Sequence, residues 1–270
     1  MRMTHSFHLT SLIIALAISL ISMAVLYAFP AGVWASWPPA TCLATGCFCE
    51  AANPLSPVKQ AVNAWSSLAY VFPGLVILGR FRGLKRQSTV FRAEYAAIVG
   101  AAAVVVGLGS AFYHASLTFT GQFFDILGMY LLSAFMLVYA LERSLNWKPR
   151  QTLVTYLLAN GGLTLVQVLV PETRRYLFAI LLLAGLMLEY RLLFTHKITV
   201  QAGWLNLGLG LFALAFGIWN LDNLGIGCDP AGLLQGHAAW HVLGAAGVGC
   251  LYRYYRSEAG KKIPGRHLQD

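Results

Sequence analysis

The sequence predicts an all-α polytopic membrane protein with a seven-transmembrane-helix core and one additional N-terminal helix. Of the 270 residues, 58% are hydrophobic and only 11% are charged, whereas a soluble domain carries about 25% charged residues. The apolar residues form long runs with few charges, and a helical run of about 20 such residues spans a bilayer. A membrane β-barrel would instead show alternating segments of about 10 residues, and the sequence does not have that pattern.

Eight apolar segments follow one another along the chain, and each is predicted to cross the membrane as a helix. They span residues 9–30, 60–79, 93–113, 122–142, 151–170, 175–194, 203–219 and 232–252. The chain is divided accordingly into three parts. Residues 1–59 form the N-terminal helix and an extracytoplasmic loop, residues 60–252 form the seven-helix core, and residues 253–270 form a basic cytoplasmic tail.

The first segment has two interpretations, an uncleaved helix or a signal peptide. Arg2 precedes it, and small residues such as Ala28, Ala31 and Gly32 near its end are compatible with cleavage. Its apolar stretch of about 20 residues is longer than the roughly 7–15 residues of a signal-peptide core. We therefore favour an uncleaved helix. Cleavage would leave seven spans in the same orientation.

The basic residues predict the orientation of the bundle. With a cytoplasmic amino terminus, 16 of the 19 Lys and Arg residues fall inside and three fall outside, which is the bias that the positive-inside rule describes. The inside residues are Arg2, Arg80, Arg82, Lys85, Arg86, Arg92, Arg143, Lys148, Arg150, Arg191, Lys197, Arg253, Arg256, Lys261, Lys262 and Arg266. The outside residues are Lys59, Arg174 and Arg175. The net charge of +9 is thus assigned to loops, and no basic stripe with interleaved aromatic residues indicates nucleic-acid binding.

The cysteines agree with this orientation. Cys42, Cys47 and Cys49 fall in the first outside loop and Cys228 falls in the last one, whereas Cys250 is near the cytoplasmic side. Thiols in an extracytoplasmic space commonly form disulfides. A Cys49–Cys228 bridge would join the two loops. A local Cys42–Cys47 bridge is the alternative, and the two pairings are compatible with each other.

Three of the seven histidines are predicted to lie at the outer ends of core helices. His114 ends the third segment, and His237 and His241 begin the eighth. The i, i+4 spacing of the last two places both imidazoles on one helix face, although unrelated histidines also show this spacing. Ionisable groups inside a membrane span are costly and are usually functional. The remaining four histidines, His5, His8, His196 and His267, fall near termini or loops and are interpreted as solvated or interfacial.

Ser110 and Asp125 are predicted at the same membrane depth as the histidines. Ser110 precedes His114 by one helical turn, and its alternative role is that of a small residue for close helix packing. Asp125 follows a short outer turn at residues 118–122, and its alternative role is that of an acid at a helix N-terminus.

Together these five residues predict a catalytic zinc site, in which three neutral imidazoles leave one position open for water. Asp125 would accept the proton of that water and pass it to the leaving group. Ser110 would donate a hydrogen bond to the oxyanion.

The same residues match a sequence pattern of a known family. Gly109–Leu117 followed by Gly121–Asp125 resembles the SxxxH…GQxxD core of the alkaline ceramidases. Trp219–Asp222, Cys228 and His237–His241 resemble the WxxD…C…HxxWH block at the carboxy-terminal end of that family.

Two further stretches extend the resemblance over residues 47–252. Cys49-Glu50 and Asn63–Ser67 are similar to the region around the first core helix of the alkaline ceramidases. The wider superfamily includes the progestin and adipoQ receptors, which have seven helices and the same set of one serine, one aspartate and three histidines.

The resemblance implies both a site and an activity. It implies a seven-helix core at residues 60–252 and a zinc ion held by His114, His237 and His241. It also implies that Asp125 and Ser110 assist catalysis. A disulfide between Cys49 and Cys228 is implied as well. The implied reaction is hydrolysis of the amide of ceramide, a lipid drawn from the bilayer, to a sphingoid base and a fatty acid.

The sequence departs from the family at two places. Eukaryotic members bind calcium through an acidic run around the Cys-Glu pair. Here Glu50 and Asn53 are the candidate calcium ligands, but Cys47, Ala51 and Ala52 occupy the neighbouring positions and Gln60 stands where an acid is expected. The second departure is the segment at residues 9–30, which is additional to the seven-helix core.

Other functions and the cellular location follow from the same residues. A hydrolase of other N-acyl or ester lipids would use the same chemistry. A seven-helix lipid receptor or transporter with structural zinc is an alternative from another class. A haem protein is disfavoured, because axial ligands face each other across the macrocycle, whereas His237 and His241 share one helix face.

No feature indicates an obligate protein partner. Short loops and few charges predict a multi-pass protein of the bacterial inner membrane, with its site extracytoplasmic and its C-terminus cytoplasmic.

Overall fold

The computed structural model describes residues 2–81 and 90–259, and each predicted apolar segment in them is helical over most of its length. The helices are α1 (Arg2–Tyr27), α2 (Ala61–Ser67), α3 (Val71–Gly79), α5 (Ala93–Ser116), α6 (Phe119–Leu145), α7 (Pro149–Leu169), α8 (Arg174–Phe194), α9 (Ala202–Asn223) and α10 (Gly236–Arg256). Short 3₁₀ turns lie at Leu43–Thr45, Leu68–Tyr70 and Pro171–Thr173. Within these residues the only strand-like pairings are two isolated bridges. His267 and six of the basic residues assigned to the inside (Arg82, Lys85, Arg86, Lys261, Lys262 and Arg266) lie outside the described residues.

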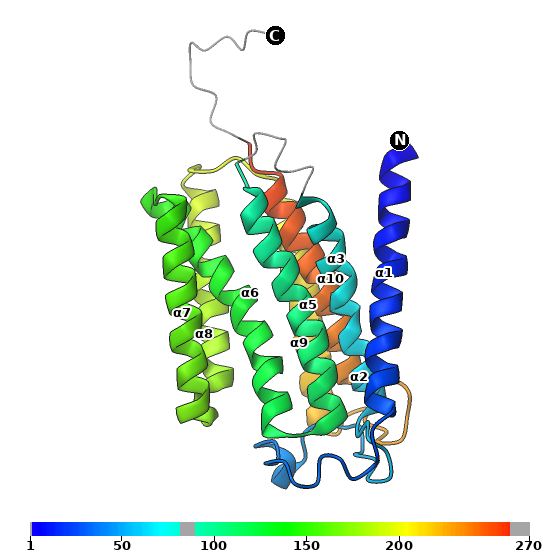
Figure 1. Cartoon of the computed structure of the whole chain (residues 1–270). Helices are drawn as coiled ribbons and strands as arrows, with labels where there is room; N and C mark the ends of the chain where they lie inside the picture. The colour runs from blue at the N-terminus through cyan, green and yellow to red at the C-terminus, as the bar shows by residue number, and fades with distance from the viewer. Residues whose placement is uncertain (1, 82–89, 260–270) are drawn as a thin grey trace, which may run out of the picture.

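Seven helical segments in the described part of the chain are long and apolar enough to cross a membrane. Six of them are α1 and α5–α9, and the seventh is the continuous stretch that α2 and α3 form through a 3₁₀ turn. The remaining helix, α10, is 21 residues long and runs alongside the others (Figure 1). It has two histidines and two arginines, which lower its hydropathy. The protein is therefore an all-α polytopic membrane protein, as the sequence predicts.

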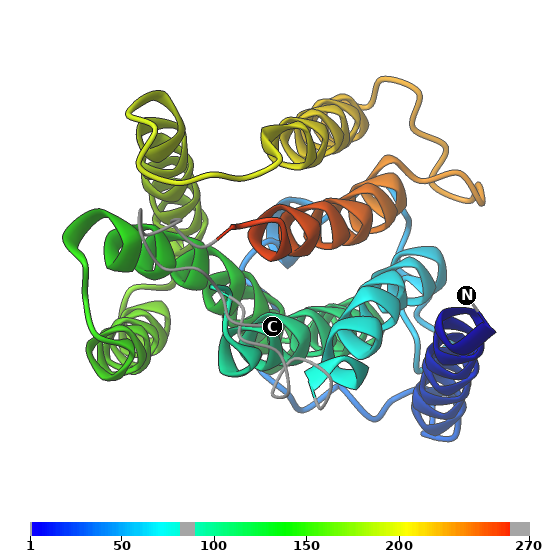
Figure 2. The same ribbon diagram turned by 90° about the horizontal axis from the view of Figure 1, so that it is seen from above.

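The helices stand side by side, and their connections alternate between the two ends of the bundle (Figure 1). Seen along the bundle, α5, α6, α3 and α10 form the centre, whereas α7 and α8 lie at one side (Figure 2). Helix α1 packs against α3 and α5 only at the edge, and most of its apolar residues remain exposed. This position agrees with an additional helix outside a seven-helix core.

The connection between α5 and α6 is shorter than the sequence indicates. Thr118 caps α6 by accepting a hydrogen bond from Gly121 N at 3.1 Å, so the turn expected at residues 118–122 is mostly the first turn of the helix. Leu117 adopts the left-handed conformation with φ 49° and is the only other connecting residue. This two-residue connection places the ends of α5 and α6 side by side.

Glycines let α5 and α6 approach closely below this turn. A Cβ atom at Gly109 would lie 2.6 Å from the carbonyl oxygen of Phe124, and one at Gly128 would lie 2.7 Å from the Cα atom of Val106. Close helix packing around Ser110, the alternative role that its sequence position indicates, is therefore supported by the geometry, and it brings Ser110 on α5 next to Asp125 on α6.

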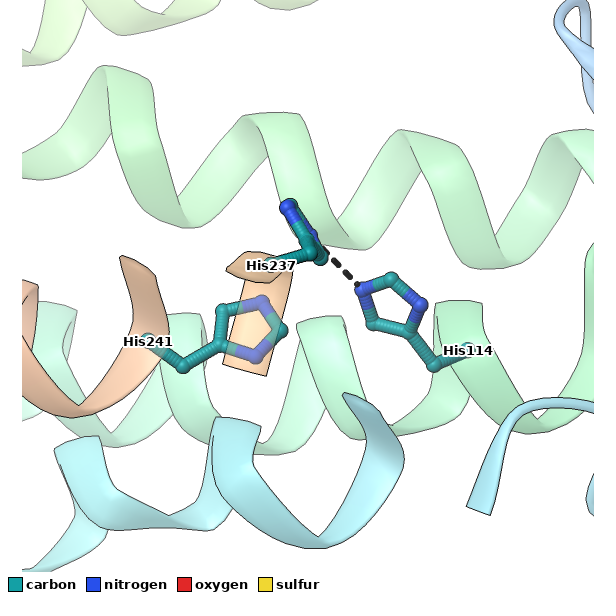
Figure 3. A group of neighbouring side chains, drawn as sticks. All are labelled: His114, His237 and His241. Carbon is teal, nitrogen blue, oxygen red and sulfur yellow. Dashed lines mark hydrogen bonds between the residues drawn. The ribbon is translucent and has the colours of Figure 1, made fainter. Parts of the chain in front are cut away.

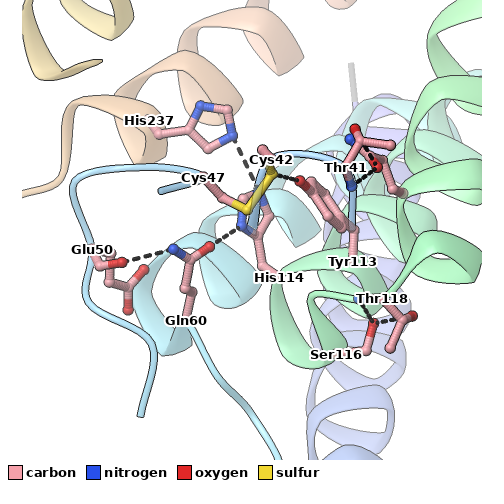
Figure 4. Close-up of a disulfide and its surroundings, with 11 residues drawn as sticks. Thr41, Cys42, Cys47, Glu50, Gln60, Tyr113, His114, Ser116, Thr118 and His237 are labelled. Atoms are coloured by element: carbon pink, nitrogen blue, oxygen red, sulfur yellow. Dashed lines mark hydrogen bonds between the residues drawn. A yellow bond between two sulfur atoms is a disulfide. The ribbon is translucent and has the colours of Figure 1, made fainter. Parts of the chain in front are cut away.

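Both compatible disulfides are formed. Cys42 is bonded to Cys47, and Cys49 is bonded to Cys228 across 179 residues. Cys250 is free and buried. The loop between α1 and α2, which contains the first three cysteines, folds back over the end of α5 (Figure 4). There Gln60 N donates to the carbonyl of His114 at 3.0 Å.

Candidate metal centre

The three predicted histidines meet at the end of the bundle where the loop between α1 and α2 lies. His114 is on the last turn of α5, and His237 and His241 are on the first two turns of α10 (Figure 3). All three are buried, with exposed fractions of 0%, 7% and 3%. Their candidate ligand atoms all lie within 4.8 Å of one another, and the Nε2 atoms of His114 and His237 are 3.2 Å apart.

A hydrogen-bond relay fixes the imidazole of His114. Gln60 Nε2 donates to the carbonyl oxygen of Glu50 at 2.7 Å, so Gln60 Oε1 turns toward His114 (Figure 4). That oxygen accepts from His114 Nδ1 at 2.9 Å. Because an amide oxygen cannot donate, Nδ1 carries the ring proton and Nε2 presents its lone pair to the centre.

Two serines of α2 fix the imidazole of His241 in the same way. Ser66 Oγ and Ser67 Oγ lie 2.9 and 3.3 Å from His241 Nδ1. Both hydroxyls donate their single proton to the carbonyl oxygen of Asn63, at 3.0 and 2.7 Å. They therefore act as acceptors for His241 Nδ1–H, which leaves Nε2 as a free electron-pair donor.

His237 is held by aromatic rings instead. Phe48 stacks on its imidazole with centroids 4.0 Å apart and an interplanar angle of 27°, and Trp219 approaches at 5.9 Å. His237 Nδ1 is buried without a hydrogen-bond partner among the described residues. His237 is thus oriented by packing rather than by a hydrogen bond to the ring.

This donor set fits a divalent transition metal. Two nitrogens bound to one tetrahedral zinc ion lie about 3.3 Å apart when each bond is about 2.05 Å, and the Nε2 atoms of His114 and His237 are at 3.2 Å. The histidine ring protons are directed outward on two of the rings, and no cysteine joins the group. Three imidazoles without a fourth protein ligand are typical of catalytic zinc.

Ser110 adjoins His241, and Asp125 in turn adjoins Ser110. Ser110 Oγ lies 3.3 Å from His241 Nε2 and is within hydrogen-bonding reach of the Asp125 carboxylate. Ser110 is buried, whereas Asp125 is partly exposed. The structure thus brings together all five residues that the sequence places at one membrane depth.

Comparison with protein-family models matches residues 44–259, which are 216 of the 270 residues, to the Ceramidase family. The chain belongs to the Ceramidase family. The match confirms the resemblance drawn from the SxxxH…GQxxD and HxxWH stretches. The matched residues include all three histidines and every described helix except α1. They also include the Cys49–Cys228 disulfide and Cys47, but not Cys42, the partner of Cys47. Among curated proteins, no match to this ceramidase-family chain was found.

The aspartate of the WxxD stretch has a positioning role in this ceramidase-family protein. Asp222 lies near the end of α9 and accepts a hydrogen bond at 2.9 Å from the backbone N–H of Gly236. Gly236 is the first residue of α10. A Cβ atom at Gly236 would lie 2.6 Å from Asp222 Cβ. The contact fixes the start of α10 one residue before His237.

The two candidate calcium ligands have other partners. Glu50 accepts hydrogen bonds from Val62 N and Asn63 N, both at 2.8 Å, and thereby caps α2. Burial raises the pKa of Glu50, and these two backbone donors act against that rise. Asn53 accepts from Leu55 N in an exposed turn. The calcium site at Glu50 and Asn53 stays a prediction.

Four residues with clear positions at the site are not predicted as site residues by the sequence: Gln60, Ser66, Ser67 and Phe48. Ser66 and Ser67 belong to a stretch that resembles the family, and Gln60 stands where an acid is expected. Its function as the acceptor for His114 depends on a contact between residues 54 apart in the chain. No local spacing indicates such a contact.

Proposed function

We propose that this protein is a zinc-dependent intramembrane amidohydrolase that cleaves ceramide-like lipids to a sphingoid base and a fatty acid. Membership of the Ceramidase family implies an amidohydrolase. The observation that carries the zinc assignment is the buried convergence of His114, His237 and His241 beside the Ser110–Asp125 pair. Because receptors of the wider superfamily have the same five residues, it is the family match that favours a hydrolase over a receptor.

The residues divide the chemistry as follows. Zinc bound by the three histidines would polarise the amide carbonyl and make water more acidic. Asp125 accepts a proton from the attacking water and delivers it to the amide nitrogen as the C–N bond breaks. The water oxygen ends in the carboxylic acid, and the nitrogen leaves as the amine of the sphingoid base.

Ser110 orients the Asp125 carboxylate in this proposal. Its one hydroxyl proton has two possible acceptors, His241 Nε2 and Asp125. When Nε2 serves as a metal ligand, the proton goes to the carboxylate. Once Asp125 has accepted the proton of the water, the hydroxyl of Ser110 is free to donate to the oxyanion instead.

We place the site on the extracytoplasmic side of a membrane, with the C-terminus in the cytoplasm. Both disulfides lie at the same end of the bundle as the histidines, and disulfides persist in oxidising compartments. The opposite end contains the C-terminal end of α10 with Arg253 and Arg256, as the positive-inside rule requires. The lipid substrate would reach the site from the outer leaflet.

The substrate class is tested on the detergent-solubilised full chain. Ceramides, N-acyl amino lipids and phospholipids are offered separately, with and without a chelator, and released fatty acid is measured. We expect release from ceramides only, loss of activity with the chelator, and recovery on adding zinc. Release from another class would replace ceramide as the substrate. A zinc-loaded protein that releases fatty acid from none of these lipids would favour the receptor alternative.

Removing a metal ligand should abolish both zinc binding and turnover. His237→Ala and His241→Ala each leave two imidazoles, which hold zinc weakly. Bound metal is measured by mass spectrometry of the purified protein, and ceramide hydrolysis is measured in parallel. His196→Asn is the control, because His196 is exposed in the loop after α8 and has φ 50°, which asparagine tolerates. Parent-level zinc in both alanine variants would refute the ligand assignment.

Changing the proposed base should separate metal binding from turnover. Asp125→Asn retains the shape of the side chain but cannot accept a proton, so we expect zinc content to persist while turnover falls by about 10²–10⁴-fold. Asp229→Asn, in an exposed loop, is the control and should hydrolyse ceramide like the parent. Parent-rate hydrolysis by Asp125→Asn would show that another group is the base.

A further inference from the structure

The three histidines are held in place by different forces. His114 and His241 each have an acceptor at Nδ1, whereas His237 Nδ1 is buried without a partner among the described residues. The ring of His237 is instead covered by Phe48, which stacks on it at 4.0 Å and also lies 4.8 Å from the ring of His114. A single aromatic side chain therefore contacts two of the three candidate metal ligands.

Phe48 is itself held on both sides by a covalent bond. Its neighbours Cys47 and Cys49 belong to different disulfides, one to Cys42 in the same loop and the other to Cys228 in the loop before α10. Cys42 Sγ also lies 3.0 Å from the hydroxyl of Tyr113. The Cys47–Cys49 backbone is therefore tied both to the end of α5 and to the loop that leads into His237.

We propose that Phe48 is a positioning residue that fixes the imidazole of His237 for metal ligation and covers it from the outer aqueous side. The two adjacent disulfides hold the phenyl ring against the imidazole, replacing the Nδ1 hydrogen bond that the other two histidines have. The inference rests on the proposed zinc site for its metal-binding part. The covering of His237 is a property of the chain itself.

A packing role alone would have a different signature. Phe48 is only partly buried and lies at the margin of the small cluster formed by Ala40, Cys42, Tyr113 and Leu117. If it merely filled space there, its removal would lower stability without singling out one histidine. The positioning role predicts an effect on the histidines that Phe48 contacts, largest at His237 and absent at His241, and one that depends on the aromatic ring.

The test has one readout without metal and one with metal. In metal-free protein, diethyl pyrocarbonate modifies accessible imidazoles, and peptide mass spectrometry gives the rate at each histidine. Phe48→Ala should raise the rate at His237 several-fold and leave His241 unchanged. Phe48→Trp should behave like the parent. Phe29→Ala is the control, since Phe29 packs on Trp34 in the same outer region and is 42% exposed.

The second readout is zinc affinity, measured by competition with a chromophoric chelator. Phe48→Ala should weaken binding by about tenfold, the lower range for groups that support a metal ligand, and should add nothing in a His237→Ala background. Phe48→Leu fills similar space without a ring and should resemble Phe48→Ala, which keeps the test valid if the alanine variant does not fold.

The outcomes separate the inference from the proposed function. Equal His237 labelling in the parent, Phe48→Ala and Phe48→Leu would overturn the covering role, and unchanged zinc affinity in these variants would overturn the positioning role. A parent protein that binds no zinc would refute the proposed function, and the metal-free labelling would then decide the inference alone.

Discussion

At the scale of single residues, the acceptors at Nδ1 decide which nitrogen of His114 and of His241 faces the centre. Gln60→Leu removes the acceptor at 2.9 Å from His114 Nδ1 and leaves that N–H buried without a partner. We expect zinc affinity to fall by about 10–100-fold, as for other groups that orient metal ligands. Competition with a chromophoric chelator measures the loss.

Gln60→Glu is the matched variant for this prediction. Its carboxylate retains an acceptor for His114 Nδ1–H, although it loses the donor to the Glu50 carbonyl. Zinc affinity should therefore stay closer to the parent in Gln60→Glu than in Gln60→Leu. Equal losses in the two variants would mean that the Glu50 contact, and not the His114 acceptor, matters.

The sequence predicts some of these residues and not others for a physical reason. Ser110 and His114, like His237 and His241, are one helical turn apart, so periodicity alone places each pair on one helix face. Ser66 and His241 are 175 residues apart, and only the packing of α2 against α10 brings them together. The shared helix faces of Ser110 with His114 and of His237 with His241 were thus predictable, whereas the contacts that support these side chains were not.

At the scale of helices, the apolar runs predict which segments are helical, but capping contacts determine where each helix begins. The eighth segment is predicted from residue 232, yet α10 starts at Gly236, where Asp222 accepts the first free N–H group. The same helix continues four residues past the predicted end of the core, to Arg256. Hydropathy does not predict where α10 begins or ends, because capping depends on single polar atoms.

The close approach of α5 to α6 positions the base in our proposal. Gly109→Ala places a methyl group 2.6 Å from the Phe124 carbonyl oxygen and 3.2 Å from Asp125 N, so α6 has to move. We expect a loss of about 1–3 kcal/mol in stability from this overpacking, together with a fall in turnover because Asp125 shifts. Thermal unfolding in detergent and ceramide hydrolysis are the measurements.

Gly161→Ala is the control for this substitution. Gly161 is in the interior of α7, and a Cβ atom there meets nothing within 4 Å. Alanine is favoured over glycine in a helix by up to about 1 kcal/mol, so this variant should be as stable as the parent or more so. If Gly109→Ala behaved like Gly161→Ala, the close contact would not constrain α6.

At the scale of the whole molecule, the two ends of the bundle are stabilised by different chemistry. The end with the histidines has two disulfides and the folded loop between α1 and α2. The other end has a buried charged cluster, in which Arg143 of α6 pairs with Glu189 of α8 and with Glu258 just after α10. Tyr254 and Tyr255 donate to the Glu189 carboxylate at 2.8 and 3.1 Å.

Because the two ends are separate, a change at Glu189 should affect stability without affecting the metal site. Glu189→Gln leaves Arg143 with a weaker partner at a site where the Glu189 side chain is fully buried, and losing one member of a buried pair costs about 3–5 kcal/mol. Glu94→Gln removes the partner of Arg92 in a pair whose side chains are about half exposed, and such surface pairs contribute about 0–1 kcal/mol. We therefore expect a large fall in melting temperature for Glu189→Gln and almost none for Glu94→Gln, measured by thermal unfolding in detergent.

Zinc affinity should stay at the parent value in both, since the charged cluster and the histidines lie at opposite ends of the helices. A loss of zinc in Glu189→Gln at temperatures where the protein is still folded would show that the two ends are coupled.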